Sequence, residues 1–295
     1  MLCNPFTKQV VSILLLALPA SCVHAADPPI PSNLAPPPGA AAAGFKRIVF
    51  QEEFNDLSGI DIDDTRKPGF NFYPKLAWGK YVLPKEHIRV EDGVLHLTNP
   101  QNNAQSDLFS AVSDKYKSGD YTGFAIGGGA YFEASIAFDP DCRKKNPGIE
   151  GFPAFYSNPV EHFFFKTLLP YDYLELDHME YNSSWYPDRS DYLHALIKWT
   201  VDRTGLHRDF VDPVWKRRII DPPGEPDFNS FNTFAALWIP GVEGRVDTYF
   251  NNQLCRSLTA KEYPKLRVGD DQHFIVILGA GQWPIRVDWV RVWSE

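Results

Sequence analysis

The chain has 295 residues, of which 44% are hydrophobic and 14% aromatic, and its formal net charge at pH 7 is −8. This length can bury the core of one large domain or of two small ones. The acidic balance excludes the basic footprint of a nucleic-acid-binding protein, and the abundance of aromatic residues, Pro and Gly favours an all-β domain.

Residues 1–25 have the pattern of a secretory signal peptide: a lysine near the start, an apolar core over 10–20, and small residues before Ala26. The apolar run is too short for a membrane span. Pro19 stands where a lipoprotein signal carries an aliphatic residue, which disfavours lipid anchoring at Cys22. We therefore expect a secreted or periplasmic protein.

Residues 26–44 are rich in Pro and Ala, cannot bury much surface, and are interpreted as a linker or tether. We expect one folded domain over 45–295. Within it, short segments alternate apolar and polar residues and end at Gly, Pro, Asn or Asp. These segments are 47–54, 93–99, 130–138, 152–156, 192–201, 233–240, 244–252, 273–280 and 285–293. The pattern predicts a β-sandwich without a long helix, in which 202–232 and most of 139–169 form loops.

Three acids lie close together in the middle of the chain among apolar and aromatic residues, a composition that fits a β-strand. In a strand, Glu175 and Asp177 point to the same face, whereas Glu180, at an odd spacing, points to the other. One extra residue, a β-bulge near His178 or Met179, would return Glu180 to the first face. We therefore predict a bulged strand that lines one face with three carboxylates.

Such a cluster suits glycoside hydrolysis, in which one carboxylate attacks the sugar carbon and another group protonates the leaving oxygen. A central Asp can share a proton with the nucleophile, and its charge raises the pKa of its neighbours. The bare pattern also arises by chance in a chain with many acids, where it would mark an exposed strand edge. The surrounding motifs distinguish these two interpretations.

Seven segments, in order, resemble glycoside hydrolase family 16, the group of laminarinases, agarases and carrageenases. They are VFQEEFND (49–56), EDGVLHLT (91–98), GGAYFEASIAF (128–138), GFPAFY (151–156), ELDHME (175–180), FNTFAALWIP (231–240) and VDWVRVW (287–293). The resemblance implies a β-jelly-roll sandwich of two antiparallel sheets with a sugar-binding cleft on the concave face. It also implies a retaining, double-displacement mechanism.

By position, the resemblance makes Glu175 the nucleophile, Glu180 the general acid/base, and Asp177 the residue that orients Glu175. The bulged form of the motif is typical of laminarinase-like members, so an endo-acting hydrolase of β-1,3-glucan is the leading expectation. β-Galactans such as agar, carrageenan or porphyran are the alternative substrates, and a transglycosylase would use the same residues. The alternative from another class is a lectin-like sandwich that binds carbohydrate without catalysis.

The subsites depart from the family pattern, since Phe152 and Tyr156 replace two tryptophans and Asn232 replaces a histidine. Asn232 is either a hydrogen-bond donor to sugar or a turn residue. Each aromatic ring near the site is either a sugar platform or part of the core. The rings expected to contact sugar are Trp185, Trp283, Tyr156 and Trp78.

Alternation along the strands assigns three other rings to the core: Trp199, Trp289 and Trp293. His178, on the bulge, is expected to pack and not to react. His194 and Lys198 share one strand face and are expected to face water in preference to a sugar.

Cys142 and Cys255 remain after the signal peptide, and they either pair as a disulfide or stay separate thiols. The sequence has no zinc motif, and catalysis is expected to need no cofactor. The resemblance implies a structural calcium on the convex face, with Glu53 and Asp288 as candidate oxygen ligands. We expect a monomer whose partner is its polysaccharide.

Overall fold

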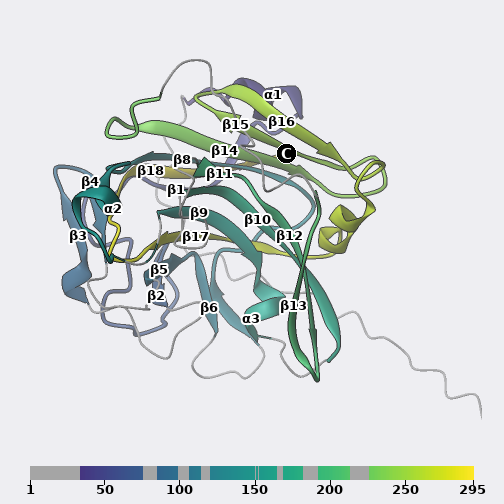
Figure 1. Ribbon diagram of the computed structural model, residues 1–295, viewed down its shortest axis with the longest axis horizontal. Coiled ribbons are helices and arrows are strands. Elements are labelled where there is room, and N and C mark those ends of the chain that lie inside the picture. Colours follow the sequence, from purple (N-terminus) through teal and green to yellow (C-terminus); the bar gives the residue numbers. More distant parts are fainter. Residues whose placement is uncertain are drawn as a thin grey trace, which may run out of the picture.

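Two large antiparallel sheets stack face to face, as Figure 1 shows for the computed structural model. The structure describes residues 34–75, 85–98, 106–113, 120–149, 151, 153–164, 169–181, 192–212 and 226–295. The helices in this part of the chain are short, and none of them is long and apolar enough to cross a membrane. The predicted β-jelly-roll sandwich is confirmed.

Sheet 1 has the spatial order β16-β15-β14-β8-β18-β4-β3, with β1 paired to β18. Its strands are β1 (Arg47–Glu52), β3 (Ile88–Glu91), β4 (Val94–Leu97), β8 (Ala130–Ala137), β14 (Asn232–Ile239), β15 (Arg245–Phe250), β16 (Gln253–Thr259) and β18 (Ile285–Ser294). Sheet 2 has the order β13-β12-β10-β9-β17-β5-β2, with β11 paired to β10. Its strands are β2 (Tyr73–Lys75), β5 (Ser106–Phe109), β9 (Ala154–Pro159), β10 (Tyr171–Tyr181), β11 (Tyr192–Leu193), β12 (Leu196–Asp202), β13 (Gly205–Phe210) and β17 (Phe274–Ala280).

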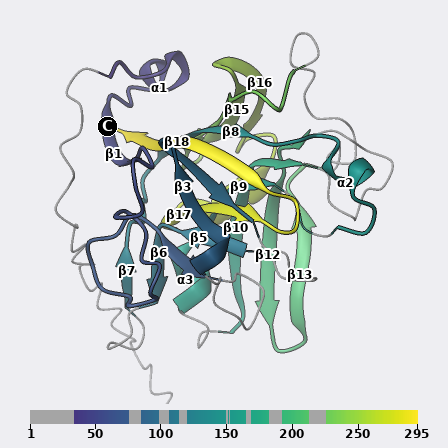
Figure 2. The same ribbon diagram turned by 90° about the vertical axis from the view of Figure 1, so that its left-hand side faces the viewer.

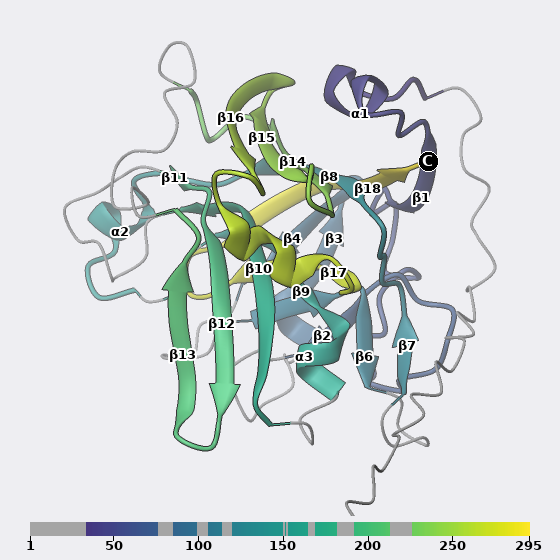
Figure 3. The ribbon, with the colours of Figure 1, turned by 90° about the vertical axis from the view of Figure 1, so that its right-hand side faces the viewer.

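The other described elements are small. They are the paired strands β6 (Ala111–Ser113) and β7 (Tyr121–Gly123), the helices α1 (Pro38–Ala42), α2 (Cys142–Lys145) and α3 (Val160–Phe164), and the 3₁₀ turns η1 (Lys85–His87) and η2 (Pro264–Gly269). Figure 3 shows β10, β12 and β13 side by side, with α3, β6 and β7 on the opposite side of β10.

The core between the sheets follows from the two-residue alternation of side chains along each strand. In β8, Phe132, Ala134 and Ile136 are fully buried in the main hydrophobic cluster, which also takes in the apolar faces of sheet 2. Tyr131 belongs to a second cluster on the outer face of sheet 1. Removing these apolar faces from water, at about 25 cal/mol per Å², is the main term that stabilises the sandwich.

Each strand segment predicted from the sequence contains a strand, and the differences lie at the ends. The segment predicted at 152–156 is β9, Ala154–Pro159, and the one predicted at 192–201 is divided into β11 and β12 around His194 and Ala195. Residues 139–149 hold only α2 and irregular backbone, as expected for a loop.

The loop predicted over 202–232 is wrong in its first part, because Gly205–Phe210 form β13, the edge strand of sheet 2. Most of these residues are exposed, so the apolar alternation that marks a half-buried strand is missing from the sequence. The strand forms because its backbone pairs with β12 along six residues, from Gly205 opposite Asp202 to Phe210 opposite Ile197. Residues 213–225 lie outside the described part.

The linker predicted over 26–44 is described from residue 34 onward, where most residues are exposed or partly exposed, but this part contains a helix, α1, with one buried residue. Helix α1 lies over the outer face of sheet 1 in Figures 1 and 2, and Ala40 is fully buried in the second cluster with Tyr249 and Trp293. A Cβ atom at Gly39 would lie 2.7 Å from Tyr249 Cζ. The small side chains of Gly39 and Ala40 bury little surface of their own, but they let the backbone of α1 lie close to the rings of Tyr249 and Trp293. The signal peptide predicted over 1–25 lies outside the described residues.

Cys142 and Cys255 are both free thiols, so the disulfide alternative is wrong. Cys142 lies in helix α2 and Cys255 in the edge strand β16 of sheet 1. The Sγ atom of Cys255 instead donates to the carbonyl of Gln253 on its own strand, at 3.4 Å.

The substitution Ala40→Glu is expected to lower the thermal midpoint, because it places a carboxylate in an apolar cluster. An unpaired buried polar group costs about 1–3 kcal/mol, which corresponds to a drop of roughly 2–10 °C in a domain of this size. Ala41→Glu is the matched control, since Ala41 is exposed on the same helix. Scanning calorimetry that gives both variants the same midpoint would contradict a stabilising role for α1.

Candidate active site

Strand β10 carries all three predicted acids and lies in the interior of sheet 2, between β9 and β12. Leu174 and Leu176 point into the core between the sheets. Glu175 and Asp177 alternate with them and therefore point away from sheet 1, to what we call the acid face of sheet 2. Asp177 lies directly opposite Tyr156 on β9.

The predicted β-bulge is confirmed just after Asp177. The pairing of β10 with β9 shifts register between Asp177 and Met179, so His178 is an extra residue with no counterpart on β9. In a regular strand, the odd spacing of Glu175 and Glu180 would put them on opposite faces. The extra residue reverses the alternation once and brings Glu180 to the acid face.

The acids lie in a largely closed setting. Asp177 is 1% exposed and Glu175 7%, while Glu180 remains more open to solvent. Trp199 on β12 donates its Nε1 hydrogen to Glu175 Oε2 at 3.1 Å. Asn158, fully buried on β9 next to Glu175, also favours the charged form of this carboxyl. Trp199 therefore supplies Glu175 with a hydrogen-bond donor that favours its charged form.

Burial raises the pKa of Glu175 to about 7, against the opposing effects of Asn158 and Trp199. The pKa of Glu180 rises to about 8, first through burial and then through the negative charge of Glu175. Burial raises the pKa of Asp177 well above its ordinary value, and the charges of Glu180 and Glu175 add to this. At neutral pH the cluster therefore holds protons that isolated carboxylates would lose.

Two further charged groups act on the acids from neighbouring strands. Arg208, exposed on β13, lowers the pKa of Glu175 and of Glu180 by its positive charge. Asp107 on β5 is fully buried, accepts a hydrogen bond from the hydroxyl of Tyr156 at 3.2 Å, and raises the pKa of Glu180. The acid cluster thus lies between a cation on one side and a fourth carboxyl group on the other.

Asn158, Asp107 and Arg208 were not predicted from the sequence, and the prediction that Trp199 lies in the core is wrong. Alternation along β12 shows which residues share a strand face with Trp199, but it does not show whether that face packs in the core between the sheets. The other three residues become neighbours of β10 only through strand pairing, and no spacing in the sequence links them to the acids.

The other two rings assigned to the core differ from each other. Trp293 is 1% exposed, as predicted, but it lies under α1 on the outer face of sheet 1. Trp289 is only partly buried and packs against the guanidinium of Arg291, whose Cζ lies 4.0 Å from the ring centroid.

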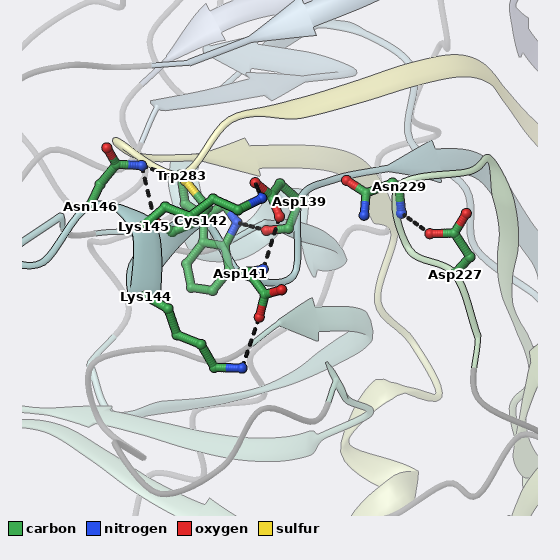
Figure 4. Close-up of polar contacts among 9 residues, drawn as sticks. All are labelled: Asp139, Asp141, Cys142, Lys144, Lys145, Asn146, Asp227, Asn229 and Trp283. Atoms are coloured by element: carbon green, nitrogen blue, oxygen red, sulfur yellow. Dashed lines mark hydrogen bonds and ion pairs between the residues drawn. The ribbon is translucent and has the colours of Figure 1, made fainter.

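Trp283 is not a sugar platform, and the prediction that it stacks on sugar is wrong. The side chain is 1% exposed, its Nε1 donates to the carbonyl of Asp139 at 2.9 Å, and the ring packs edge-on against Tyr181 with centroids 5.4 Å apart. Figure 4 shows the indole beside the segment that carries Cys142 and Asn146. The turn-like sequence around Trp283 suggested exposure, but the 139–149 loop packs over it.

Asn232 is the first residue of β14, and the prediction that it contacts sugar is wrong. It lies in sheet 1, where its Nδ2 donates to the carbonyls of Asp227 and Ser230, each at 2.9 Å. Its Oδ1 accepts from Asn251 Nδ2, also at 2.9 Å. Both ends of the amide therefore bind the protein itself, on the sheet that does not carry the acids.

Tyr156 borders the acids but does not present an open ring. It lies on the acid face, is 3% exposed, and packs with Phe109 and Ile277. Trp78 and Trp185 lie outside the described residues, so their role as sugar platforms stays a prediction.

The histidines near the acids are buried. His178 is fully buried in the core, as predicted, whereas the expectation that His194 faces water is wrong, because it is 2% exposed and burial lowers its pKa to about 3. Lys198 lies opposite Leu174, on the other face from Glu175, and pairs with Asp172 at 2.9 Å. Lys198 is therefore not placed to contact a sugar at the acids.

The contacts of Glu53 and Asp288, the two predicted calcium ligands, argue against a calcium site between them. Glu53 Oε1 accepts from Arg291 Nη2 at 2.9 Å and from Nε at 3.1 Å, so a guanidinium already neutralises this carboxylate. Asp288 Oδ2 lies 3.5 Å from Ser135 Oγ. Among the described residues, no group of three His, Cys, Asp or Glu side chains could hold a metal ion. Calcium binding stays a prediction that these contacts argue against.

No protein-family model matches this sequence, and no curated protein matches it. Solved structures share its fold. The β-agarase A of Zobellia galactanivorans has 15% identity and a TM-score of 0.55, over 84% of this chain and 92% of its own. A β-porphyranase from Bacteroides plebeius has 14% identity and a TM-score of 0.51, over 85% and 92%. The laminarinase catalytic domain of Thermotoga petrophila has 20% identity and a TM-score of 0.46, over 84% and 98%. At these identities the likeness to the first two structures establishes the fold alone, a β-sandwich.

The raised pKa values predict that stability falls as the pH rises. Between the ordinary Glu value of 4.5 and about 8, the folded protein binds protons that the unfolded chain has lost, so the free energy of unfolding decreases with pH. The thermal midpoint should therefore be lower at about pH 8.5 than at about pH 5.5. Glu180→Gln removes one of these protonation sites, so it should flatten the dependence and raise the midpoint at the higher pH.

Glu243→Gln is the matched control, because Glu243 is exposed in the β14–β15 turn and far from the acids. It should leave the slope of midpoint against pH unchanged. A Glu180→Gln slope equal to that of the control would show that Glu180 does not hold a proton in the folded protein.

Proposed function

We propose that the chain is a secreted, retaining endo-glycoside hydrolase of family 16 that cleaves a β-linked polysaccharide by double displacement. The observation that carries the proposal is the bulged strand, which places Glu175, Asp177 and Glu180 on one face with different surroundings. The shared fold supports this proposal, but the fold alone hosts many activities.

Glu175 is the proposed nucleophile. The Trp199 indole and the Asn158 amide favour its charged form, and the charge of Arg208 acts in the same direction. An ionised carboxylate can attack the anomeric carbon to form a covalent glycosyl-enzyme. The Trp199 hydrogen bond also holds the carboxylate in one orientation, so little reorganisation is needed at the moment of attack.

Glu180 is the proposed general acid and base. Its pKa of about 8 lies above that of Glu175, so the last proton of the pair resides on Glu180 at neutral pH. This proton goes to the glycosidic oxygen as the bond to the leaving sugar breaks. The resulting carboxylate then removes a proton from the water that attacks the glycosyl-enzyme, which restores both groups.

Asp177 is the proposed orienting acid between these two. Its pKa is raised so strongly that it stays protonated while Glu175 is ionised, and it can then donate a hydrogen bond to Glu175. The hydrogen bond both fixes the nucleophile and disperses its charge. Asp177 also stabilises Glu175 as a leaving group in the second step, because the returning negative charge meets a donor.

β-1,3-Glucan is the proposed substrate, because the bulged motif is typical of laminarinase-like proteins. β-Galactans are the alternative: the β-agarase and the β-porphyranase are named for galactan substrates, but their identities to this chain are 15% and 14%. The proposal that the protein is secreted is based on the signal-peptide pattern of residues 1–25. The proposal that its partner is a polysaccharide is based on the three acids. A monomer is the simplest assembly for an endo-acting enzyme.

The substitutions Glu175→Gln and Glu180→Gln are each expected to lower kcat on the native polysaccharide by roughly a thousandfold or more, since each removes a group that takes part in bond making. Asp177→Asn, which keeps a donor to Glu175, should lose less. The measurement is reducing-end release from a panel that contains β-1,3-glucan, agarose, carrageenan and porphyran.

Glu133→Gln is the matched control, because Glu133 is a buried glutamate whose pKa is also raised, to about 7, but it lies on the outer face of sheet 1. Its activity should equal that of the unmodified protein. Unchanged product release by Glu175→Gln would refute the mechanism. Retention of polysaccharide in affinity gels without any product, by the unmodified protein, would instead favour the lectin-like alternative.

Trp199→Phe tests the surroundings of the nucleophile. It removes a hydrogen bond that lowers the pKa of Glu175, so this pKa should rise and the low-pH limb of kcat/KM should move upward by roughly half a unit to one unit. Trp289→Phe, on the other sheet, is the control and should leave the profile in place. A low-pH limb that is the same in both variants would contradict the assignment of that limb to Glu175.

A further inference from the structure

His178, the extra residue of the bulge, takes no part in the proposed chemistry, yet it is a polar side chain at a fully buried position. Its imidazole stacks on Phe132 of sheet 1, with ring centroids 5.0 Å apart and planes at 20°, and contacts Phe155 of β9 at 4.7 Å. An apolar ring would fill this space without the cost of burying a polar group. Packing volume alone therefore does not explain why a polar imidazole occupies this buried position.

Ser157 provides the partner that a buried imidazole requires. Its Oγ lies 2.8 Å from His178 Nε2, and both side chains are fully buried. Ser157 belongs to β9, where it lies opposite Leu176, and the register between β9 and β10 shifts just beyond Asp177. The hydrogen bond thus joins His178, the extra residue of β10, to β9, the strand on which it has no counterpart.

His178 contributes this bond without a charge. Burial, together with the nearby His194, lowers the pKa of His178 well below its ordinary value, so the imidazole is neutral. Its Nδ1 is buried and has no hydrogen-bond partner in the described part of the chain. The tautomer that carries its proton on Nε2, and donates it to Ser157, avoids burying an unpaired N–H group.

We propose that His178 and Ser157 are a positioning pair, whose hydrogen bond fixes the bulge between Asp177 and Glu180 and so keeps the three acids on one face. The catalytic consequence of the pair rests on the proposed function, whereas its geometric consequence does not. Neither residue touches the acid face, and both act through the backbone of β10.

The need for such a pair follows from the nature of a bulge. A bulge held only by apolar packing can move along its strand, because the ladder hydrogen bonds lost at one residue form again at the next. A shift to the other side of Asp177 would turn this carboxyl into the core, and loss of the bulge would turn Glu180 there. On the β12 side, the backbone N–H of Asp177 is fixed by the carbonyl of Ala195 at 2.8 Å. On the β9 side, the His178–Ser157 bond fixes the extra residue.

The test uses four variants of the full chain. Ser157→Ala and His178→Phe remove the bond while keeping most of the packing volume, and the double variant removes both partners. His178→Gln keeps an amide nitrogen near the position of Nε2 and should restore most of what His178→Phe loses. Ser135→Ala, a buried serine on sheet 1, is the matched control and should behave like the unmodified protein.

Each variant that lacks the bond should lose roughly 10- to 100-fold in kcat on the responsive polysaccharide, with KM within about threefold, because a displacement near 1 Å costs about a hundredfold at a reacting centre. The double variant should be no worse than His178→Phe alone, since one bond cannot be lost twice. Values of kcat within twofold of the unmodified protein in both Ser157→Ala and His178→Phe would overturn the proposal.

A second measurement does not depend on activity. In the unmodified protein the carboxyl carbon of Glu180, followed by ¹³C NMR, should titrate near the raised pKa of about 8. In Ser157→Ala and His178→Phe it should titrate at lower pH, as Glu180 leaves the cluster for part of the time. If the unmodified protein cleaves no glycan but the Glu180 titration shifts in these variants, the proposed function is refuted and the positioning pair is supported. Titration at the same pH in all variants would refute the pair. If His178→Phe does not fold, Ser157→Ala and His178→Gln carry the same test.

Discussion

The odd spacing between Asp177 and Glu180 is the constraint on which the rest of the site depends. Side chains alternate along a strand, so a regular β10 would place one of these carboxyl groups in the core between the sheets. The register shift at His178 solves this problem with one extra residue. Because the shift lies in an interior strand, it is held from both sides, by the backbone of the β11–β12 connection and by β9. Three carboxyl groups thereby share one largely closed surface.

Crowding of the acids on that surface explains their electrostatics. Burial raises the pKa of all three carboxyl groups, and the charges of neighbouring acids add to this for Asp177 and Glu180, whereas the donors act mainly on Glu175. Trp199, Asn158 and Arg208 favour a negative charge on Glu175, whereas Glu180 faces Asp107 and keeps its proton to higher pH. The environment therefore separates two chemically identical side chains into a candidate nucleophile and a candidate acid.

The remainder of the sandwich serves as a rigid support for this arrangement. The core between the sheets is filled by alternating apolar residues, and α1 covers the aromatic cluster on the outer face of sheet 1. Solved structures with 14% and 15% identity share the architecture, so the likeness establishes the fold and not a substrate.

The sequence by itself determined the sandwich class, most strands of the core, the three acids and the bulge that aligns them. These features are local, because alternation and the odd spacing act between residues a few positions apart. Only the tertiary structure decided which face of each strand is buried and which strands are neighbours. In the structure, Trp283 and Asn232 do not lie at the acids, whereas Trp199, Asn158 and Asp107 lie near them. Cys142 and Cys255 are free thiols. The physical reason is that alternation repeats identically on both faces of a strand, while strand order depends on the packing of the whole chain.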